Sequence, residues 1–124
     1  MIKWFERHYV ISWVCVFLIG SFIFYVSSWE FAPVVPGPAN LNAILYHIIA
    51  FFFFTGILSI ALVKGKKKSF LLISFLIALG YGVLDEIHQY FVPGRCATFD
   101  DVFLDLIGIS FAILVYWILI EMRR

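Results

Sequence analysis

Residues 85–95 of the chain read DEIHQYFVPGR, a stretch that places ionisable side chains at the end of a largely apolar run. The run covers residues 69–91 and is long enough to cross a bilayer as a helix. Pro93 and Gly94 then end it in a turn that leads to Arg95. Because ionisable side chains at membrane depth are costly unless they are paired or hydrated, the stretch predicts a membrane helix with a functional site at its end.

The composition of the whole chain is typical of a membrane protein. The chain has 124 residues, of which 64% are hydrophobic and 14% are charged. The two cysteines, Cys15 and Cys96, are expected at different depths and therefore unpaired. A soluble domain of this size has no room to bury so much apolar surface, so we expect an integral membrane protein with a single domain over residues 1–124.

Four apolar runs predict the fold class, an all-α membrane bundle of four transmembrane helices. The first run, residues 9–27, contains no charge and would span roughly 28 Å as a helix. Its length and its aromatic residues favour a retained helix over a cleaved signal peptide. The predicted helices cover residues 9–27, 43–63, 69–91 and 100–121.

The segment between the first two predicted helices, residues 29–42, contains Pro33, Pro36 and Pro38. This composition predicts a rigid loop. Asn40 or Asn42 is expected to cap the second helix, because an asparagine side chain accepts hydrogen bonds from the free N–H groups of a first helical turn.

Lysine and arginine residues are distributed unevenly along the chain. They occur near the N-terminus, in the turn Lys64–Lys68 and at the C-terminus, whereas the other two connections hold only Arg95. Under the positive-inside rule both termini are predicted to be cytoplasmic, and residues 29–42 and 92–98 are predicted to face outside. The alternative for the lysine turn is a nucleic-acid patch. A basic turn between two spans favours the topological role, so we expect a multi-pass protein of the cell membrane with no nucleic-acid partner.

Small residues predict how the third and fourth helices pack. Ser74, Ala78 and Gly82 recur every four positions, which lets helix backbones approach closely in lipid. On the fourth helix, acidic and small residues share one face: Asp101, Asp105, Gly108 and Ala112. Because a short loop makes the two helices antiparallel neighbours, we expect their small-residue faces to pack together and to bring the acidic residues of both helices together.

Polar residues of three predicted helices fall at similar depths. His47, Glu86 and Asp105 lie within about one helical turn of each other, and Arg95 follows in the next loop. The sequence therefore predicts a polar pocket open to the outer leaflet. Its candidate ligand-binding residues are His47, Glu86, Gln89, Arg95, Asp101 and Asp105.

Neighbouring polar residues have structural alternatives. Asp85 and Glu86 are about 100° apart on a helix, so only one is expected to point fully inward, and the register with the small residues favours Glu86. His88 lies on a different face and is expected at the membrane interface. Asp101 also fits a capping position three residues after Thr98, a role that is compatible with a place in the site.

The predicted pocket holds more acids than bases. Five ionised carboxylates in a partly dry region would repel each other, so some are protonated or a cation is present. A divalent cation is a candidate cofactor, because hard cations take carboxylate oxygens, and its candidate ligands are Glu86, Asp101 and Asp105. The chain has no HExxH or comparable spacing, so metal binding stays open.

Residues 86–95 fit the pattern E-x-x-Q-x-F-x-P-G-R. Asp101 follows six residues after Arg95, Gly108 lies in the last predicted helix, and His47 lies early in the second. This combination resembles the VanZ-like family of small integral membrane proteins. The motif covers about a quarter of the chain, and the four-helix layout covers nearly all of it.

The chain departs from the family pattern at several positions. The family's asparagine is Asp105 here, one later glycine is Ala112, and the Asp-Lys pair that often precedes the histidine is Ala43-Ile44. The predicted pocket is therefore more acidic, and a ligand of another member need not transfer. The founding member is linked to teicoplanin resistance, so the resemblance implies a cell-envelope protein and stops short of a reaction.

Three functions are compatible with these residues. The first is binding of a lipid-linked or head-group envelope ligand, with Arg95 contacting its phosphate or carboxylate. The second is a metal-dependent membrane hydrolase acting on an envelope lipid or precursor, with Glu86 as candidate catalytic base. The third is a small ion-coupled transporter. The acids cluster at one end and no nucleophile motif is present, which favours binding over the other two.

Overall fold

The computed structural model describes residues 1–30 and 41–123, and all regular secondary structure in these two ranges is helical. A short helix α1 (Ile2–Arg7) precedes four long helices, α2 (Tyr9–Ser27), α3 (Leu41–Val63), α4 (Phe70–Tyr90) and α5 (Phe99–Glu121). Each long helix is long and apolar enough to cross a membrane. The prediction of an all-α bundle with four such helices is confirmed, and α1 was not expected.

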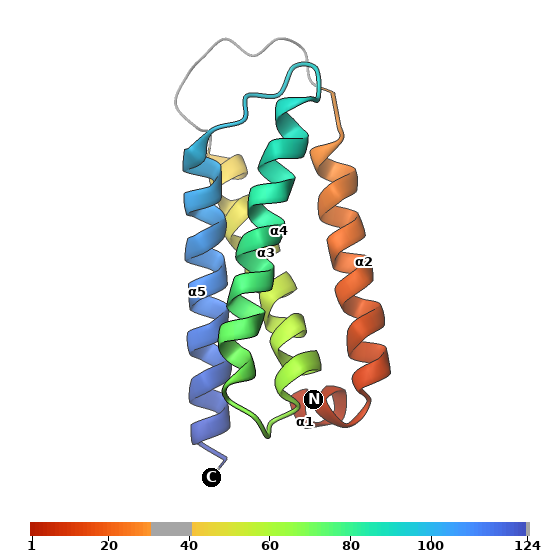
Figure 1. Ribbon diagram of the computed structural model, residues 1–124, viewed down its shortest axis with the longest axis vertical. Coiled ribbons are helices and arrows are strands. Elements are labelled where there is room, and N and C mark those ends of the chain that lie inside the picture. Colours follow the sequence, from red (N-terminus) through yellow and green to blue (C-terminus); the bar gives the residue numbers. More distant parts are fainter. Residues whose placement is uncertain (31–40, 124) are drawn as a thin grey trace.

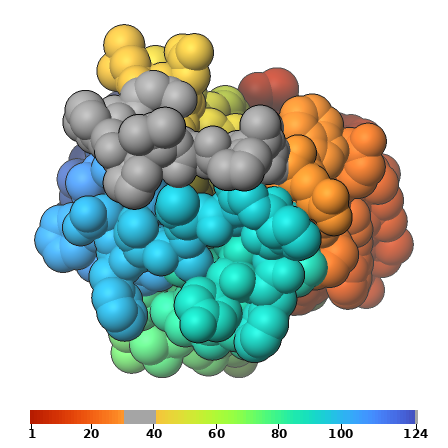
Figure 2. All heavy atoms as spheres, turned by 90° about the horizontal axis from the view of Figure 1, so that it is seen from above, coloured from red at the N-terminus to blue at the C-terminus, as the bar shows by residue number. Residues whose placement is uncertain are grey.

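Each long helix runs antiparallel to the one that follows it in the sequence, and the four form one elongated bundle (Figure 1). Both termini and the α3–α4 turn lie at one end, and the α4–α5 segment lies at the other. Seen from above, α2 lies at one side of the bundle and the α4–α5 segment lies across the facing surface (Figure 2). The acidic residues between positions 85 and 105 are thus separated from the lysine turn by most of the length of the bundle.

The start of α3 differs from the prediction. α3 begins at Leu41, two residues before the expected start, so Asn42 lies inside the helix and is not its cap. Most of the predicted rigid loop, with its three prolines and the alternative cap Asn40, lies outside the described residues.

The outer surface of the bundle is apolar over the spans. Large hydrophobic side chains such as Phe17, Phe103 and Leu84 are more than half exposed. Between a quarter and a third of each apolar span is buried inside the bundle. Such a surface is stable in lipid, where exposed apolar side chains meet hydrocarbon and not water.

The core lies around α3, which packs against α2, α4 and α5 and makes its most extensive contact with α5. Phe51, Leu58 and Ile109 are almost completely buried there. The ring of Phe54 stacks on Tyr81 of α4 with a centroid distance of 4.9 Å. The Tyr81 hydroxyl donates a hydrogen bond of 2.6 Å to the carbonyl oxygen of Gly20, and this bond joins α4 to α2.

Gly82 of α4 meets the predicted face of α5 at Asp105, whereas Gly108 of that face packs against α3 and not against α4. Ser74, Ala78 and Gly82 are buried, but a Cβ atom at position 82 would meet Asp105 and Phe51. A Cβ atom at Gly108 would lie only 2.3 Å from the carbonyl oxygen of Ile48 in α3. The small face of α5 is therefore turned toward the α3 backbone, because the close α3–α5 contact needs a residue without a side chain at this position.

Candidate ligand-binding site

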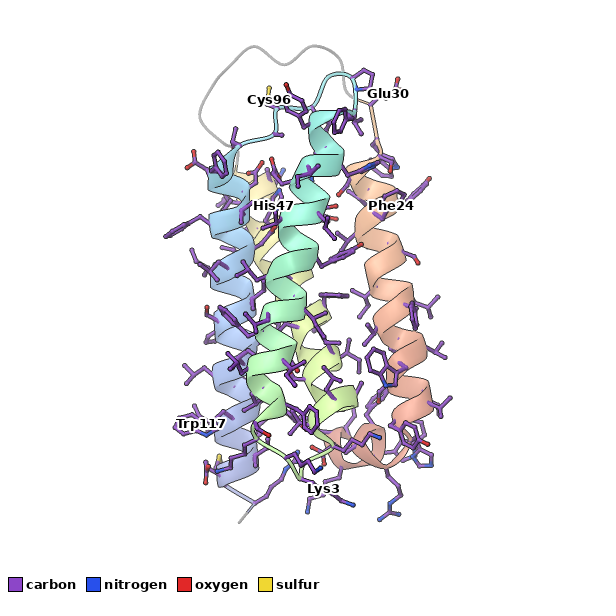
Figure 3. All side chains as sticks on the ribbon, viewed as in Figure 1. Lys3, Phe24, Glu30, His47, Cys96 and Trp117 are labelled. Atoms are coloured by element: carbon purple, nitrogen blue, oxygen red, sulfur yellow. The ribbon has the colours of Figure 1, made fainter. Side chains whose placement is uncertain are left out.

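Polar side chains from three helices meet near the end of the bundle that carries the α4–α5 segment. His47 lies in this region, below the segment that contains Cys96 (Figure 3). We refer to six residues here as the polar cluster: His47, Asp85, Glu86, Gln89, Asp101 and Asp105. Five of them are buried and Asp101 is half-buried, so the cluster is an interior feature of the bundle.

His47 and Asp105 form the innermost pair of the polar cluster. The Nδ1 atom of His47 lies 2.8 Å from Oδ1 of Asp105, and the two residues are 6% and 1% exposed. A carboxylate can only accept, so Nδ1 carries the proton when Asp105 is ionised. The other ring nitrogen, Nε2, lies 3.9 Å from Oδ1 of Asp101. The pair fixes the orientation of the imidazole ring and directs Nε2 toward the start of α5.

Glu86 links the end of α4 to the start of α5. Its Oε1 atom accepts a hydrogen bond of 2.5 Å from the backbone N–H of Thr98. Thr98 occupies the N-cap position of α5, as predicted, but its side chain makes no capping bond. In a capping box an acid of the same helix binds the N-cap N–H; here the acid comes from the neighbouring helix. Glu86 therefore sets the position of the α5 N-terminus relative to α4.

Asp85 is also buried, and this corrects the prediction that only Glu86 points inward. Asp85 is 4% exposed, and its Oδ2 atom accepts a hydrogen bond of 2.9 Å from Nε2 of Gln89. The same nitrogen lies 3.3 Å from Oγ of Ser27, near the end of α2. Because α4 packs against both α2 and α5, two residues about 100° apart can each face a neighbouring helix.

His88 lies outside the polar cluster, at the contact between α2 and α4. Its Nε2 atom lies 2.9 Å from Oγ of Ser28, and its ring stacks on Phe24 with a centroid distance of 4.4 Å. The residue is half-buried. These contacts indicate a packing role in the α2–α4 contact.

Arg95 lies in the α4–α5 segment and is half-buried. The turn before it contains Gly94 with φ of 76°, a left-handed conformation that favours glycine. Arg95 is close enough to Tyr46, the residue before His47, for the two groups to interact electrostatically. Asp100, in contrast, is exposed at the start of α5.

Three carboxylate oxygens of the polar cluster are buried and have no hydrogen-bond partner among the described residues. They are Oδ1 of Asp85, Oε2 of Glu86 and Oδ2 of Asp105. Buried polar atoms in native proteins are nearly always bonded, and leaving one unsatisfied costs about 1–3 kcal/mol. The cluster thus has spare acceptor capacity inside the bundle.

The described residues contain no group of three or more His, Cys, Asp or Glu side chains arranged to hold a metal ion. Glu86, Asp101 and Asp105, the candidate metal ligands, therefore do not form such a group in this structure. What these residues make is a network of hydrogen bonds across helix boundaries.

A family model described as VanZ/LLP1 matches residues 7–120. The chain belongs to the VanZ/LLP1 family. The match covers nearly the whole chain, so α2, α3, α4, all of α5 except its last residue, and every residue of the polar cluster lie within it. No curated protein and no solved structure matches the chain.

Two residues beside the polar cluster of this VanZ/LLP1 chain were not singled out from the sequence. Ser27 contacts Gln89 from the end of α2, and Tyr46 has a buried hydroxyl oxygen without a hydrogen-bond partner among the described residues. Depth was an available signal, since Ser27 is the last residue of α2 and Gln89 lies one residue before the end of α4. The hydropathy pattern does not indicate the direction in which these two side chains point.

Proposed function

We propose that this VanZ/LLP1 protein is a multi-pass protein of the cell envelope that binds the head group of a lipid or lipid-linked ligand at the polar cluster. Both termini would be cytoplasmic, because the turn Lys64–Lys68 and both termini share one end of the bundle (Figure 1). The polar cluster would then lie in the outer leaflet.

The observation that carries this proposal is the set of three unpartnered carboxylate oxygens in the polar cluster. Such oxygens accept hydrogen bonds from ammonium, hydroxyl or amide groups. The half-buried Arg95 adds a guanidinium that suits a phosphate or carboxylate. A ligand with both kinds of group, such as a zwitterionic head group or an amino sugar linked to lipid phosphate, matches this pair of requirements.

Ligand-induced stabilisation of the purified protein tests the proposal. Thermal unfolding would be measured with lipid phosphates, cell-wall precursors and divalent cations, for wild type, Arg95→Ala and Asp105→Asn. We expect at least one head-group ligand to raise the unfolding midpoint of wild type, and both variants to lose most of that shift.

Asp100→Asn is the matched control for this screen, because it removes the same charge as Asp105→Asn from an exposed position of the same helix. It should retain the wild-type shift. The proposal is wrong if no head-group ligand stabilises wild type, or if the shift survives in both Arg95→Ala and Asp105→Asn.

The pairing of His47 with Asp105 favours a hydrolase as the second candidate. A histidine oriented by a buried carboxylate suits a general base or a metal ligand. In that case Glu86→Gln should abolish turnover of an envelope lipid or precursor and leave ligand binding largely intact. The amide oxygen of glutamine can still accept from the Thr98 N–H, so the fold should persist. Metal analysis of the purified protein, with product release as the second readout, separates the two candidates.

Teicoplanin resistance enters the proposal through the family alone. The test is the teicoplanin susceptibility of cells that express wild type, cells that express Arg95→Ala and cells without the protein. If all three are equally susceptible, the link to teicoplanin resistance is wrong.

A further inference from the structure

A concave basic surface lies at the end of the bundle opposite the polar cluster. It encloses a cavity of about 700 Å³ where α1, the α3–α4 turn and the end of α5 meet. Lys3 marks this end of the bundle (Figure 3). We call this cavity the basic bowl, and its charged lining residues are Lys3, Glu6, Arg7, Lys64, Lys66 and Arg123.

The basic bowl carries a net positive charge. Glu6 is its acid among the described lining residues, and Oε1 of Glu6 already accepts a hydrogen bond of 2.9 Å from Arg123. The remaining positive side chains come from α1 and from the turn: Lys3, Arg7, Lys64 and Lys66. A concave surface with one sign of charge concentrates its field and attracts anions.

Fixed contacts hold the two halves of the basic bowl together. The Tyr116 hydroxyl donates a hydrogen bond of 2.8 Å to Glu6 of α1, and the same oxygen accepts one of 3.3 Å from the Gly65 N–H. Gly65 has φ of 66°, and a Cβ atom there would lie 3.0 Å from a carboxylate oxygen of Glu6. Ser12 of α2 donates to the Phe5 carbonyl at 2.8 Å. The lysines of the turn and the basic residues Lys3 and Arg7 of α1 are therefore presented from backbones with a defined relative position.

The opposite face of α1 is apolar and borders a second cavity. Met1, Ile2 and Phe5 line this cleft of about 360 Å³, which continues between α3 and α5 past Phe53 and Leu119. α1 thus separates a basic bowl from an apolar cleft over only six residues. An amphipathic helix with this division of residues lies in the membrane interface, where head groups and acyl chains are both within reach.

We propose that the basic bowl binds the phosphate-bearing head group of an anionic phospholipid, with an acyl chain of the same lipid against the apolar cleft. Basic pockets at the ends of membrane helices suit such head groups. The apolar cleft would add nothing to the binding of a soluble anion, which has no acyl chain to place there. This site is separate from the polar cluster and does not depend on the ligand proposed there. It goes beyond the general role of basic residues in orientation, because it assigns binding to particular lysines.

A matched pair of lysines in the turn tests the site. Lys66 lines the basic bowl, whereas the adjacent Lys67 lies outside its lining and has its ammonium group 5.7 Å from the Phe70 ring centroid. Both side chains are exposed, so Lys66→Gln and Lys67→Gln change the net charge equally at equivalent burial. Lys3→Gln is a second bowl variant, on a different element.

Purified wild type and the three variants would be titrated with phosphatidylglycerol in mixed micelles, and the unfolding midpoint would be followed. We expect a saturable rise for wild type, about fivefold weaker apparent affinity for Lys66→Gln and Lys3→Gln, and less than a twofold change for Lys67→Gln. Phosphatidylcholine should give no comparable rise. Midpoints without added lipid and circular dichroism show whether each variant is folded.

Three outcomes would overturn the site. Equal weakening by Lys66→Gln and Lys67→Gln would indicate diffuse attraction to the basic turn. A rise of the same size with inorganic phosphate or glycerol phosphate alone would indicate a soluble anion and exclude the lipid. No difference between phosphatidylglycerol and phosphatidylcholine in wild type would show that the basic bowl selects no anionic lipid.

Discussion

The two ends of this bundle carry opposite charges and accommodate them in opposite ways. At the polar cluster, Asp85, Glu86 and Asp105 are buried, and Glu86 and Asp105 are bound across helix boundaries. At the basic bowl, the lysines are exposed, and of the supporting residues Glu6 is half-buried and Tyr116 is buried. A buried charge depends on its partners, whereas an exposed charge is stabilised by water and head groups. Substitutions at the polar cluster should therefore cost stability, and substitutions at the basic bowl should mainly change binding.

The largest effect is expected at the His47–Asp105 pair. Asp105→Ala removes the 2.8 Å contact and leaves His47 buried without its partner. Breaking a buried pair by removing one member costs about 3 kcal/mol. Unfolding by denaturant in detergent should show this loss, with a smaller loss for Asp105→Asn, whose amide oxygen can still accept from Nδ1. Asp100→Ala is the exposed control, and an equal loss there would show that the comparison between buried and exposed acids is wrong.

An intermediate effect is expected at Gly108, where the close α3–α5 approach supports the polar cluster. Gly108→Ala places a methyl group 2.3 Å from the Ile48 carbonyl oxygen and requires the two helices to separate. Overpacking of this kind costs about 1–3 kcal/mol. The control is Gly80→Ala, because a Cβ at that position meets nothing within 4 Å beyond its chain neighbours and the nearby backbone of its own helix. Alanine is the better helix former, so Gly80→Ala should be neutral or slightly stabilising. Thermal unfolding of the two variants measures the difference. Similar unfolding midpoints would contradict the close packing of Gly108 against the α3 backbone.

The smallest effect is expected at the basic end, for the surface ion pair between Lys68 and Glu121. The Glu121 side chain is 40% exposed. Exposed pairs contribute little, so Glu121→Gln should lower stability by at most about 0.5 kcal/mol and less at high salt. Denaturant unfolding at two salt concentrations measures this, and a loss comparable to that of Asp105→Ala would remove the distinction between the two ends.

The helices themselves were largely predictable, and α1 was not. Four runs of apolar residues have the length that a bilayer requires, and hydropathy along the chain is enough to find them. α1 has six residues, which is too short for a stable isolated helix. It is held by contacts from Ser12, Tyr116 and Arg123, residues distant from it in sequence or in another helix.

The polar cluster was predictable in depth and only partly in direction. His47, Glu86 and Asp105 were expected within about one helical turn of each other, and the structure pairs His47 with Asp105. Asp85 was set aside because helical periodicity places it 100° from Glu86, yet both are buried because α4 has neighbours on two sides.

The sequence by itself determined the class of the protein, its four spans and the depth at which its charges lie. These follow from the length of each apolar run and from the number of residues between a charge and the end of its run. Only the tertiary structure decided which helix each face meets: Gly108 against the α3 backbone, Gln89 toward α2 and Glu86 toward the start of α5. Periodicity fixes a side chain relative to the axis of its own helix. The rotation of that axis toward its neighbours is set by packing among all the helices, which no single segment encodes.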